Sequence, residues 1–241
     1  MLKFNKIYKQ YETPILGPIN LEIEKDSFVS ILGSSGAGKS TLLRLASNLI
    51  QPTSGSIEYL NNKKPNIGFV FQDPTLLPWR SVIDNVLLPT ELTSKNVKLS
   101  KEKAFFWLSK VGLRGKENSL PNQLSGGQKM RVSIARAMAQ DCSLLLMDEP
   151  FAALDEVSRN KLEDDLLDIW EKNKLTVLFV THSVTEAVYL SQRVLVMSSS
   201  PGKILDDVII TEKKSRDDSQ NHEFFLKINQ LTNILKKESN E

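Results

Sequence analysis

Eight residues near the N-terminus have the types and the spacing that a phosphate group requires. They read Gly33-Ser34-Ser35-Gly36-Ala37-Gly38-Lys39-Ser40 and match the pattern G-x-x-x-x-G-K-[ST] in full. Phosphate oxygens need several converging N–H donors, and small side chains let the backbone wrap closely enough to supply them. A helix starting near Lys39 would add the positive end of its dipole. The segment is predicted to be a phosphate cradle in which Lys39 reaches the β- and γ-phosphates and the Ser40 hydroxyl ligates Mg²⁺.

Two acids directly follow a run of four apolar residues. Asp148 and Glu149 come after Leu144–Met147, and ligands of parallel sheets bind at the carboxyl ends of the strands. Asp148 is expected to hold Mg²⁺ through water, and Glu149 to act as the general base on the attacking water. The alternative is that one of these acids only caps the helix that would follow Pro150.

His182 follows another apolar run, 176–180, and is one of only two histidines in the chain. This position at a strand end predicts a contact with the γ-phosphate that also orients Glu149. The alternative is a surface or core histidine with no special role, which is the commoner case for an isolated histidine. The second histidine, His222, lies in the tail and is given no function.

The segment Leu124-Ser125-Gly126-Gly127-Gln128 opens a helical pattern and is a second candidate anion site. It combines a serine, two glycines and a helix N-terminus. One fold has little use for two such sites on one nucleotide, whereas two copies of the chain could each offer this segment to the other's cradle. The alternative is a serine N-cap followed by flexible glycines.

Alternating strands and helices are expected to position these residues. Apolar runs and apolar residues at helical spacing predict a buried, mainly parallel sheet with helices on both faces. The predicted strands are 19–23, 28–32, 57–59, 67–71, 144–147, 176–180 and 194–197. The predicted helices are 41–49, 82–88, 101–111, 127–139, 159–170 and 185–190, with a terminal helical face at 224–235. The charged stretch 211–218 is expected to be loose.

Composition narrows the possible classes of protein. The chain has 241 residues, 40% hydrophobic and 25% charged, enough for one large α/β domain or one domain with an insertion. A net charge of +2 without a long basic block gives a nucleic-acid partner no electrostatic support. The single Cys142 excludes an internal disulfide and a cysteine-based zinc cluster. With neither a signal-peptide core nor an apolar span of roughly 20 residues, a cytosolic protein is expected unless a partner holds it at a membrane.

The ordered set of motifs resembles the ATP-binding cassette (ABC) family of transporter ATPases over about residues 2–205. The motifs are the cradle, the acidic strand end, LSGGQ at 124–128, Gln72 after a strand, Ala153-Leu154-Asp155 and Thr181-His182-Ser183. The resemblance implies that LSGGQ contacts the ATP of a partner copy, that Gln72 senses metal and water, and that Asp155 couples the two sites of a homodimer. It also places Tyr11 against adenine, where ring stacking needs no base-specific hydrogen bond. The implied nucleotide contacts are Tyr11, Gly33, Ser34, Ser35, Gly36, Ala37, Gly38, Lys39, Ser40, Thr41, Gln72, Ser125, Gly126, Gly127, Gln128 and Asp155, and the implied Mg²⁺ ligands are Ser40, Gln72 and Asp148.

A finer resemblance follows Gln72. The segments 73–80 and 82–86 are similar to those of nitrate/sulfonate/taurine-type importers. The resemblance implies that the apolar segment Leu76–Trp79 docks a membrane subunit, and the alternative is that this segment is core of its own subdomain. Two positions depart from the usual pattern and bear on subgroup more than on activity. Lys129-Met130-Arg131 replaces a Gln/Arg-rich run, and Ser183 replaces an aspartate.

The predicted fold is therefore α/β: a P-loop NTPase core with a mainly parallel sheet, an N-terminal antiparallel β subdomain and an inserted α-helical subdomain. The expected parts are the core at 1–73 and 141–210, the helical signature subdomain at 74–140, and a tail with a helix at 211–241. The expected protein is a peripheral ATPase subunit at the cytoplasmic side of the cell membrane. Its expected partners are a twin copy, transmembrane permease subunits and a solute-binding protein, without nucleic acid. The alternatives are an exporter ATPase, an ABC ATPase that acts on DNA or ribosomes, a nucleotide kinase, and a scaffold that binds ATP without cleaving it.

Overall fold

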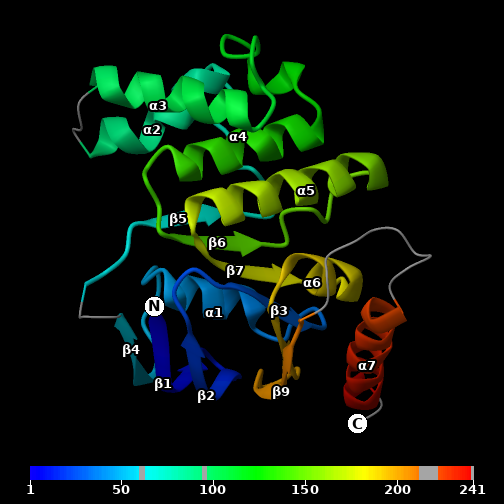
Figure 1. Cartoon of the computed structure of the whole chain (residues 1–241). Coiled ribbons are helices and arrows are strands. Elements are labelled where there is room, and N and C mark those ends of the chain that lie inside the picture. The colour runs from blue at the N-terminus through cyan, green and yellow to red at the C-terminus, as the bar shows by residue number, and fades with distance from the viewer. Residues whose placement is uncertain (60–62, 94–96, 212–221, 240–241) are drawn as a thin grey trace. The chain divides into compact units, whose positions relative to one another are not determined.

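The computed structural model describes the chain except for residues 60–62, 94–96, 212–221 and 240–241. The described residues form two compact units, one made of Met1–Lys64 and Lys174–Glu241 and the other of Pro65–Asn173. Figure 1 shows the elements of both. Apart from Thr211, the stretch expected to be loose lies outside the described residues. The predicted division into core, helical subdomain and tail stays a prediction.

The first unit contains an antiparallel sheet in which β1 lies between β2 and β4 (Figure 1). Its strands are β1 (Leu2–Gln10), β2 (Pro14–Ile23) and β4 (Ser54–Tyr59). From Leu16 to Ile23, apolar residues of β2 are buried at nearly alternate positions, as expected of a strand with one face on a core. This sheet confirms the predicted antiparallel N-terminal part.

The same unit contains strands in the order β7-β3-β8-β9. They are β7 (Thr176–Thr181), β3 (Phe28–Gly33), β8 (Arg193–Met197) and β9 (Ile204–Ile209). Strand β3 runs parallel to β7 and β8, and β9 pairs antiparallel with β8. Every residue of β3 and β7 is buried, which is typical of parallel strands covered on both faces. The predicted strands did not include β9, whose two central aspartates are unfavourable in strands, or β1.

Three helices belong to this unit: α1 (Lys39–Ala46), α6 (Val184–Leu190) and α7 (His222–Ser239). The prediction that the first helix reaches Leu49 was wrong. Asn48 has a positive φ of 62° and ends the helical path, and Leu49 is 61% exposed. Helix α7 packs on α6 and β8 and buries Phe224 and Leu231, so the predicted apolar face of the terminal helix is confirmed at these two positions.

The second unit pairs two parallel strands with four helices. The elements are β5 (Ile67–Val70), α2 (Val82–Leu92), α3 (Val97–Lys110), a short 3₁₀ helix (Pro121–Gln123), α4 (Gly126–Met138), β6 (Leu144–Asp148) and α5 (Glu156–Asn173). Helix α4 contacts α2, α3, α5 and β5, so it is the central helix of this unit.

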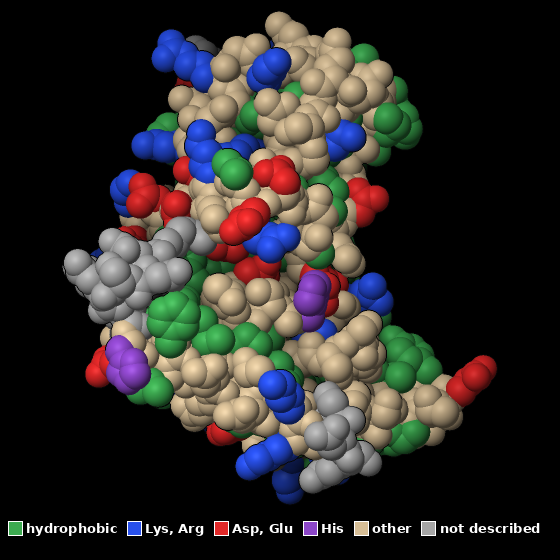
Figure 2. All heavy atoms as spheres, turned by 90° about the vertical axis from the view of Figure 1, so that its right-hand side faces the viewer, with side chains coloured by type: hydrophobic (Ala, Val, Ile, Leu, Met, Phe, Trp, Pro, Cys, Tyr) green, Lys and Arg blue, Asp and Glu red, His purple; other side chains and the backbone are tan. Residues whose placement is uncertain are grey.

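Two further observations concern membrane-spanning helices and surface charge. Within the described residues, no helix combines the length and apolar character needed to cross a bilayer. On the face drawn in Figure 2, basic and acidic side chains are interspersed, in agreement with a net charge of +2.

The packing of α7 leads to a stability prediction. Replacing the fully buried Leu231 by alanine is expected to lower the free energy of unfolding by about 2–4 kcal/mol, because a cavity replaces packed methyl groups. Leu226, on the same helix, is 52% exposed, and Leu226→Ala is expected to change stability by no more than about 0.5 kcal/mol. Urea denaturation of both variants measures the difference. Equal stabilities would show that α7 does not contribute to the cooperative fold.

Candidate functional site

The predicted phosphate cradle lies between the end of β3 and the start of α1. Gly38 precedes the helix in a left-handed conformation (φ 82°), and no side chain caps the helix start. The first turn contains no acidic residue. The first N–H groups of a helix have no partner within it, so this N-terminus offers donors and a positive dipole end to an anion.

Two glycines of the cradle are required for different reasons. A Cβ on Gly38 would lie 2.5 Å from Leu16 Cδ2, a distance that packed atoms do not reach. A Cβ on Gly36 would meet nothing within 4 Å, but φ is +84° there, which side chains rarely tolerate. Gly38 is therefore needed for packing and for conformation, whereas Gly36 is needed for conformation and leaves the loop open.

The polar groups of the cradle fit a phosphate. Lys39 is buried, and its Nζ donates to the carbonyl oxygens of Gly33 (2.9 Å) and Ser34 (2.8 Å), so the ammonium folds back over the loop. The buried Oγ of Ser34 has no hydrogen-bond partner. Because buried polar groups are nearly always paired, this hydroxyl marks a position where a phosphate oxygen would complete the site.

His182 lies at the same sheet edge as the cradle. Strand β7 is paired in parallel with β3 so that Thr181 is opposite Leu32, and His182 follows directly. The His182 side chain is exposed. Tyr11, in the same unit, is also exposed (58%), and Lys9 Nζ lies 4.8 Å from the centroid of its ring.

A buried carboxylate that the sequence prediction did not assign shapes the His182 turn. The Thr181 hydroxyl donates to Glu186 Oε2 (2.5 Å) and accepts from the Ser183 N–H (2.9 Å). Ser183 in turn caps α6 by accepting from the Glu186 N–H (3.3 Å). Glu186 is 7% exposed. A glutamate four residues after His182 at a helix start was the available signal for this role.

The second unit holds the predicted carboxylates and Gln72. Strands β5 and β6 are parallel, with Val70 opposite Met147, so Gln72 and Glu149 emerge at the same strand ends. Asp148 is buried and Glu149 partly exposed. Glu149 has a positive φ of 43°. Non-glycine residues in this region are strained and cluster at functional sites, which favours a functional role for Glu149.

The LSGGQ segment forms the N-terminus of α4. Ser125 Oγ accepts from the Gln128 N–H (3.3 Å), and Gln128 Oε1 accepts from the Ser125 N–H (3.0 Å). This is a capping box, so the alternative of a serine N-cap describes the geometry correctly. Added Cβ atoms on Gly126 and Gly127 would meet neighbours only at 3.5 Å or more. Packing within the chain therefore does not demand these glycines, and they leave the helix tip open to a group from outside.

Basic side chains surround this tip. A cavity of about 380 Å³ is bordered by Ser125, Gly127 and Gln128, and Lys110, Arg131, Lys161 and Asp165 are also among its lining residues. Three cations against one carboxylate in this part of the lining favour an anionic occupant.

Asp155 directly precedes α5, close to the same cavity. Its Oδ1 accepts from the Ser158 N–H (3.0 Å). This backbone hydrogen bond, with a further one from the Ser158 hydroxyl, lowers the pKa of Asp155. The aspartate therefore remains ionised at neutral pH and keeps the start of α5 in place.

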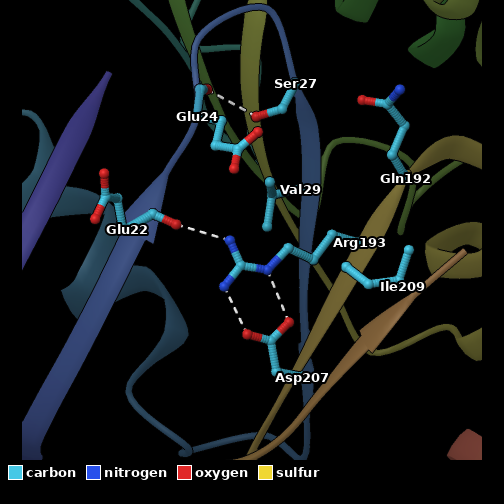
Figure 3. Close-up of a pocket in the computed structure, with 8 residues that line it drawn as sticks. All are labelled: Glu22, Glu24, Ser27, Val29, Gln192, Arg193, Asp207 and Ile209. Atoms are coloured by element: carbon cyan, nitrogen blue, oxygen red, sulfur yellow. Dashed lines mark hydrogen bonds and ion pairs between the residues drawn. The ribbon is translucent and has the colours of Figure 1, made fainter.

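A different cavity, of about 800 Å³, lies in the first unit and contains none of the predicted site residues. It is lined by Glu22, Glu24, Ser27, Val29, Gln192, Arg193, Asp207 and Ile209 (Figure 3). Arg193 forms a bidentate pair with Asp207 (2.7 and 2.6 Å) and also donates to the Glu22 carbonyl oxygen (2.7 Å). These contacts tie β8 to β9 and β2. Val29 lies near the start of β3, so this cavity is at the opposite end of that strand from the cradle. The hydrogen bonds of Arg193 here connect neighbouring strands.

The predicted site residues therefore fall into two sets. The first unit brings together the cradle, Gly33 to Thr41, with His182, and it also contains Tyr11. The second unit contains Gln72, Asp148 and Glu149 at one strand edge and LSGGQ with Asp155 at two helix starts. The described residues contain no cluster of three or more His, Cys, Asp or Glu side chains able to hold a metal ion. A metal here would need hydroxyl, phosphate or water ligands, which is usual for Mg²⁺.

Comparisons with known proteins identify relatives of the chain. Residues 16–152 match the family model described as "ABC transporter". The aliphatic sulfonates import ATP-binding protein SsuB of Bacillus cereus is 42% identical over 218 residues, covering 89% of this chain and 85% of the relative. The nitrate import ATP-binding protein NrtD of Synechococcus elongatus is 38% identical, covering 86% of this chain and 80% of the relative.

A solved structure supports the fold. It is described as the dimeric structure of a post-hydrolysis state of an ATP-binding cassette bound to ADP and Pi. It superimposes with a TM-score of 0.77 at 32% identity, covering 88% of this chain and all of that one. The predicted P-loop NTPase fold is confirmed.

Ser34 provides a test of the cradle. Ser34→Ala is expected to leave the free energy of unfolding unchanged or raise it by up to about 1 kcal/mol, because it removes a buried hydroxyl that has no partner. The same change is expected to weaken ATP binding roughly tenfold, because a hydrogen bond to a charged oxygen is lost. Calorimetry and urea denaturation measure the two effects. Ser47→Ala, just beyond the other end of α1, is the control, and equal ATP affinity of the two variants would contradict the role given to Ser34.

Proposed function

Because the chain belongs to the ABC transporter family, we propose that it is the ATPase subunit that drives uptake of a small solute through separate membrane subunits. It hydrolyses ATP to ADP and phosphate, in keeping with its family and with the ADP- and Pi-bound cassette that it resembles. The observation that carries the proposal is that one chain contains two open helix N-termini suited to anions, the cradle before α1 and the LSGGQ tip of α4.

The two anion sites suggest a dimer in which each nucleotide has contacts from both copies. The cradle of one copy holds the phosphates through its N–H groups, Lys39 and Ser34, and the LSGGQ tip of the twin closes over the γ-phosphate. Tyr11 stacks on adenine. The solved cassettes described as dimeric support this pairing. Closure on ATP and opening after hydrolysis would move the attached membrane subunits between two states.

The strand-end residues perform the hydrolysis in this proposal. Glu149 accepts the proton of the attacking water as its oxygen bonds to the γ-phosphorus and the bond to the β-phosphate oxygen breaks. His182 contacts the γ-phosphate and orients Glu149. Asp155 couples the two sites across the dimer.

Mg²⁺ is part of the same proposal. It would neutralise charge on the β- and γ-phosphates when bound. The Ser40 hydroxyl, Asp148 through water and the Gln72 amide would hold it. These oxygen donors fit a cation that keeps several waters and few protein ligands.

The loop that follows Gln72, residues 73–81, is proposed to dock a membrane subunit and is called the Trp79 loop below. Trp79 is 74% exposed at its tip, whereas Leu76 and Leu77 are partly buried. The indole is therefore not part of its own subdomain core, and a large exposed aromatic ring is a common anchor of interfaces. A membrane subunit bound at this loop would keep the chain at the cytoplasmic face of the cell membrane.

The solute class rests on the relatives. The similarity to import proteins named for aliphatic sulfonates and for nitrate supports a small anionic or sulfonate-like solute. The candidate anion sites of the described residues, the cradle and the LSGGQ tip, are both assigned to the nucleotide. Selection of the solute would therefore belong to the membrane subunits and to a solute-binding protein.

The role of Glu149 makes a kinetic prediction. Glu149→Gln is expected to bind ATP normally, to lower kcat by ~10²–10⁴-fold because the general base is lost, and to accumulate as a dimer with ATP and Mg²⁺. Steady-state turnover and analytical ultracentrifugation measure these effects, with Glu171→Gln, an exposed position on α5, as the control. Normal turnover in Glu149→Gln would remove Glu149 from the catalytic role.

The docking proposal predicts a separate effect of Trp79. Trp79→Ala is expected to leave the ATPase rate of the isolated chain unchanged and to weaken its association with its membrane subunits in nanodiscs by at least about tenfold, as for an interface anchor. Leu92→Ala, at a similarly exposed position (77%), is the matched control. Co-purification at graded concentrations measures the association, and full binding of Trp79→Ala would refute docking at this loop.

A further inference from the structure

The guanidinium of Arg136, near the end of α4, is bonded to the first half of the Trp79 loop. Arg136 Nη2 donates to the Pro74 carbonyl oxygen (2.7 Å) and to the Thr75 hydroxyl (3.1 Å). Nη1 donates to the Thr75 carbonyl oxygen (3.0 Å). A planar guanidinium with several fixed donors can hold two consecutive carbonyls, which an ammonium cannot do in the same way.

Arg136 is partly buried, so its charge loses part of its hydration and needs polar partners within the protein. Burial lowers the pKa of Arg136 from its usual value, although an arginine remains protonated. Among the described residues, no carboxylate forms an ion pair with it. The desolvated charge is therefore compensated mainly by carbonyl and hydroxyl oxygens of the loop, with a longer contact to Ser133 Oγ (3.4 Å).

The clamped segment is held in an unfavourable conformation. Thr75 has a positive φ of 48°, which is rare for a β-branched residue. Its N–H donates to Asp73 Oδ1 (3.0 Å), which closes a tight turn directly after Gln72. Strained residues persist where surrounding contacts overdetermine them, and the Arg136 contacts to Pro74 and Thr75 supply that constraint.

The second half of the loop is fixed by Asn85, a fully buried residue of α2. Its Nδ2 donates to the carbonyl oxygens of Leu77, Arg80 and Ser81 at 3.0–3.1 Å, and its Oδ1 accepts from the Leu77 N–H (2.7 Å). The Trp79 loop is thus attached to α4 at one half and to α2 at the other, with the exposed indole between them.

Helix α4 carries the LSGGQ tip at its start and Arg136 in its last turn. Arg136 lies ten positions after Gly126, a length of about 15 Å in an α-helix. We propose that Arg136 is the positioning residue that makes the LSGGQ tip, α4 and the Trp79 loop move as one piece. Nucleotide contact at the tip then displaces the loop, and Gln72 with it.

This inference deepens the proposed function and rests on it, because it assumes that ATP from a twin copy reaches the LSGGQ tip. It does not require that the membrane subunit docks at Trp79. Arg136 touches neither nucleotide nor water in this proposal, so it acts only through the loop. Removing the Arg136 guanidinium should therefore leave the response of the LSGGQ tip to ATP intact and abolish the response of the Trp79 loop.

Hydrogen–deuterium exchange of the full chain carrying Glu149→Gln, with and without ATP and Mg²⁺, tests the link. In this parent, nucleotide is expected to slow exchange at the LSGGQ tip and to change exchange of the Thr75 and Leu77 N–H groups. With Arg136→Met added, the tip is expected to respond as before and the loop to lose its response. Without nucleotide, the loop of this variant is expected to exchange at least about tenfold faster, because charge-assisted hydrogen bonds are lost.

Three further variants keep the test decisive. Thr75→Gly relieves the strained φ and removes the hydroxyl contact, but it keeps Arg136 and the two backbone carbonyl oxygens that the guanidinium binds, so its loop should still respond to ATP. Arg136→Lys should restore the response only in part. Lys103→Met is the control in the same unit, since Lys103 of α3 pairs with Asp141 instead of the loop, and it should respond like the parent.

The other possible outcomes contradict either the role of Arg136 or the proposed ATP-dependent pairing. A loop that still responds to ATP in Arg136→Met overturns the inference, as does a loop that stops responding in Thr75→Gly, or a parent whose tip responds while its loop does not. Loss of the tip response together with the loop response in Arg136→Met would show that Arg136 only supports the helix, and also overturns it. A parent without any tip response contradicts the proposed ATP-dependent pairing itself, and the inference falls with it.

Discussion

The unpaired N–H groups at the start of an α-helix are the constraint on which the rest of this structure depends. Each helix must find acceptors for these donors outside itself. Helices α4 and α6 and the turn before α5 use side chains of the chain for this purpose, from Ser125, Ser183 and Asp155. Helix α1 has Gly38 in that position and no side-chain cap, and a helix start of this kind favours an anionic ligand.

The cradle and the LSGGQ tip, the two halves of the proposed nucleotide site, differ in this respect. The cradle contains an unpaired buried hydroxyl on Ser34 and a lysine turned onto its own loop, so it gains contacts when phosphate binds. The LSGGQ tip is already satisfied by its capping box, and it is open because its glycines present no side chain.

Two of the residues with a strained backbone lie at or beside residues proposed to act. Glu149 and Thr75 both have positive φ, one at the end of β6 and the other just after Gln72. At Thr75, hydrogen bonds from Arg136 of α4 help to hold this conformation. Conformations of this kind persist only where the surrounding structure stabilises them, and they are common at functional sites.

The sequence by itself determined the local features of this protein. The cradle, the acidic strand end, LSGGQ and most helices and strands were predictable, because each depends on residue types within a few positions of each other. The predicted end of the first helix and the omitted β9 show the limit. Asn48 stops α1 before the apolar Leu49, and β9 forms despite two aspartates by pairing with β8, where Arg193 also binds Asp207. The role of Arg136 was also beyond prediction, since its partners lie 61 and 62 residues away in the chain. Only the tertiary structure decided these points. Partners that are distant in sequence meet only once the chain has folded, and only then does burial strengthen their hydrogen bonds.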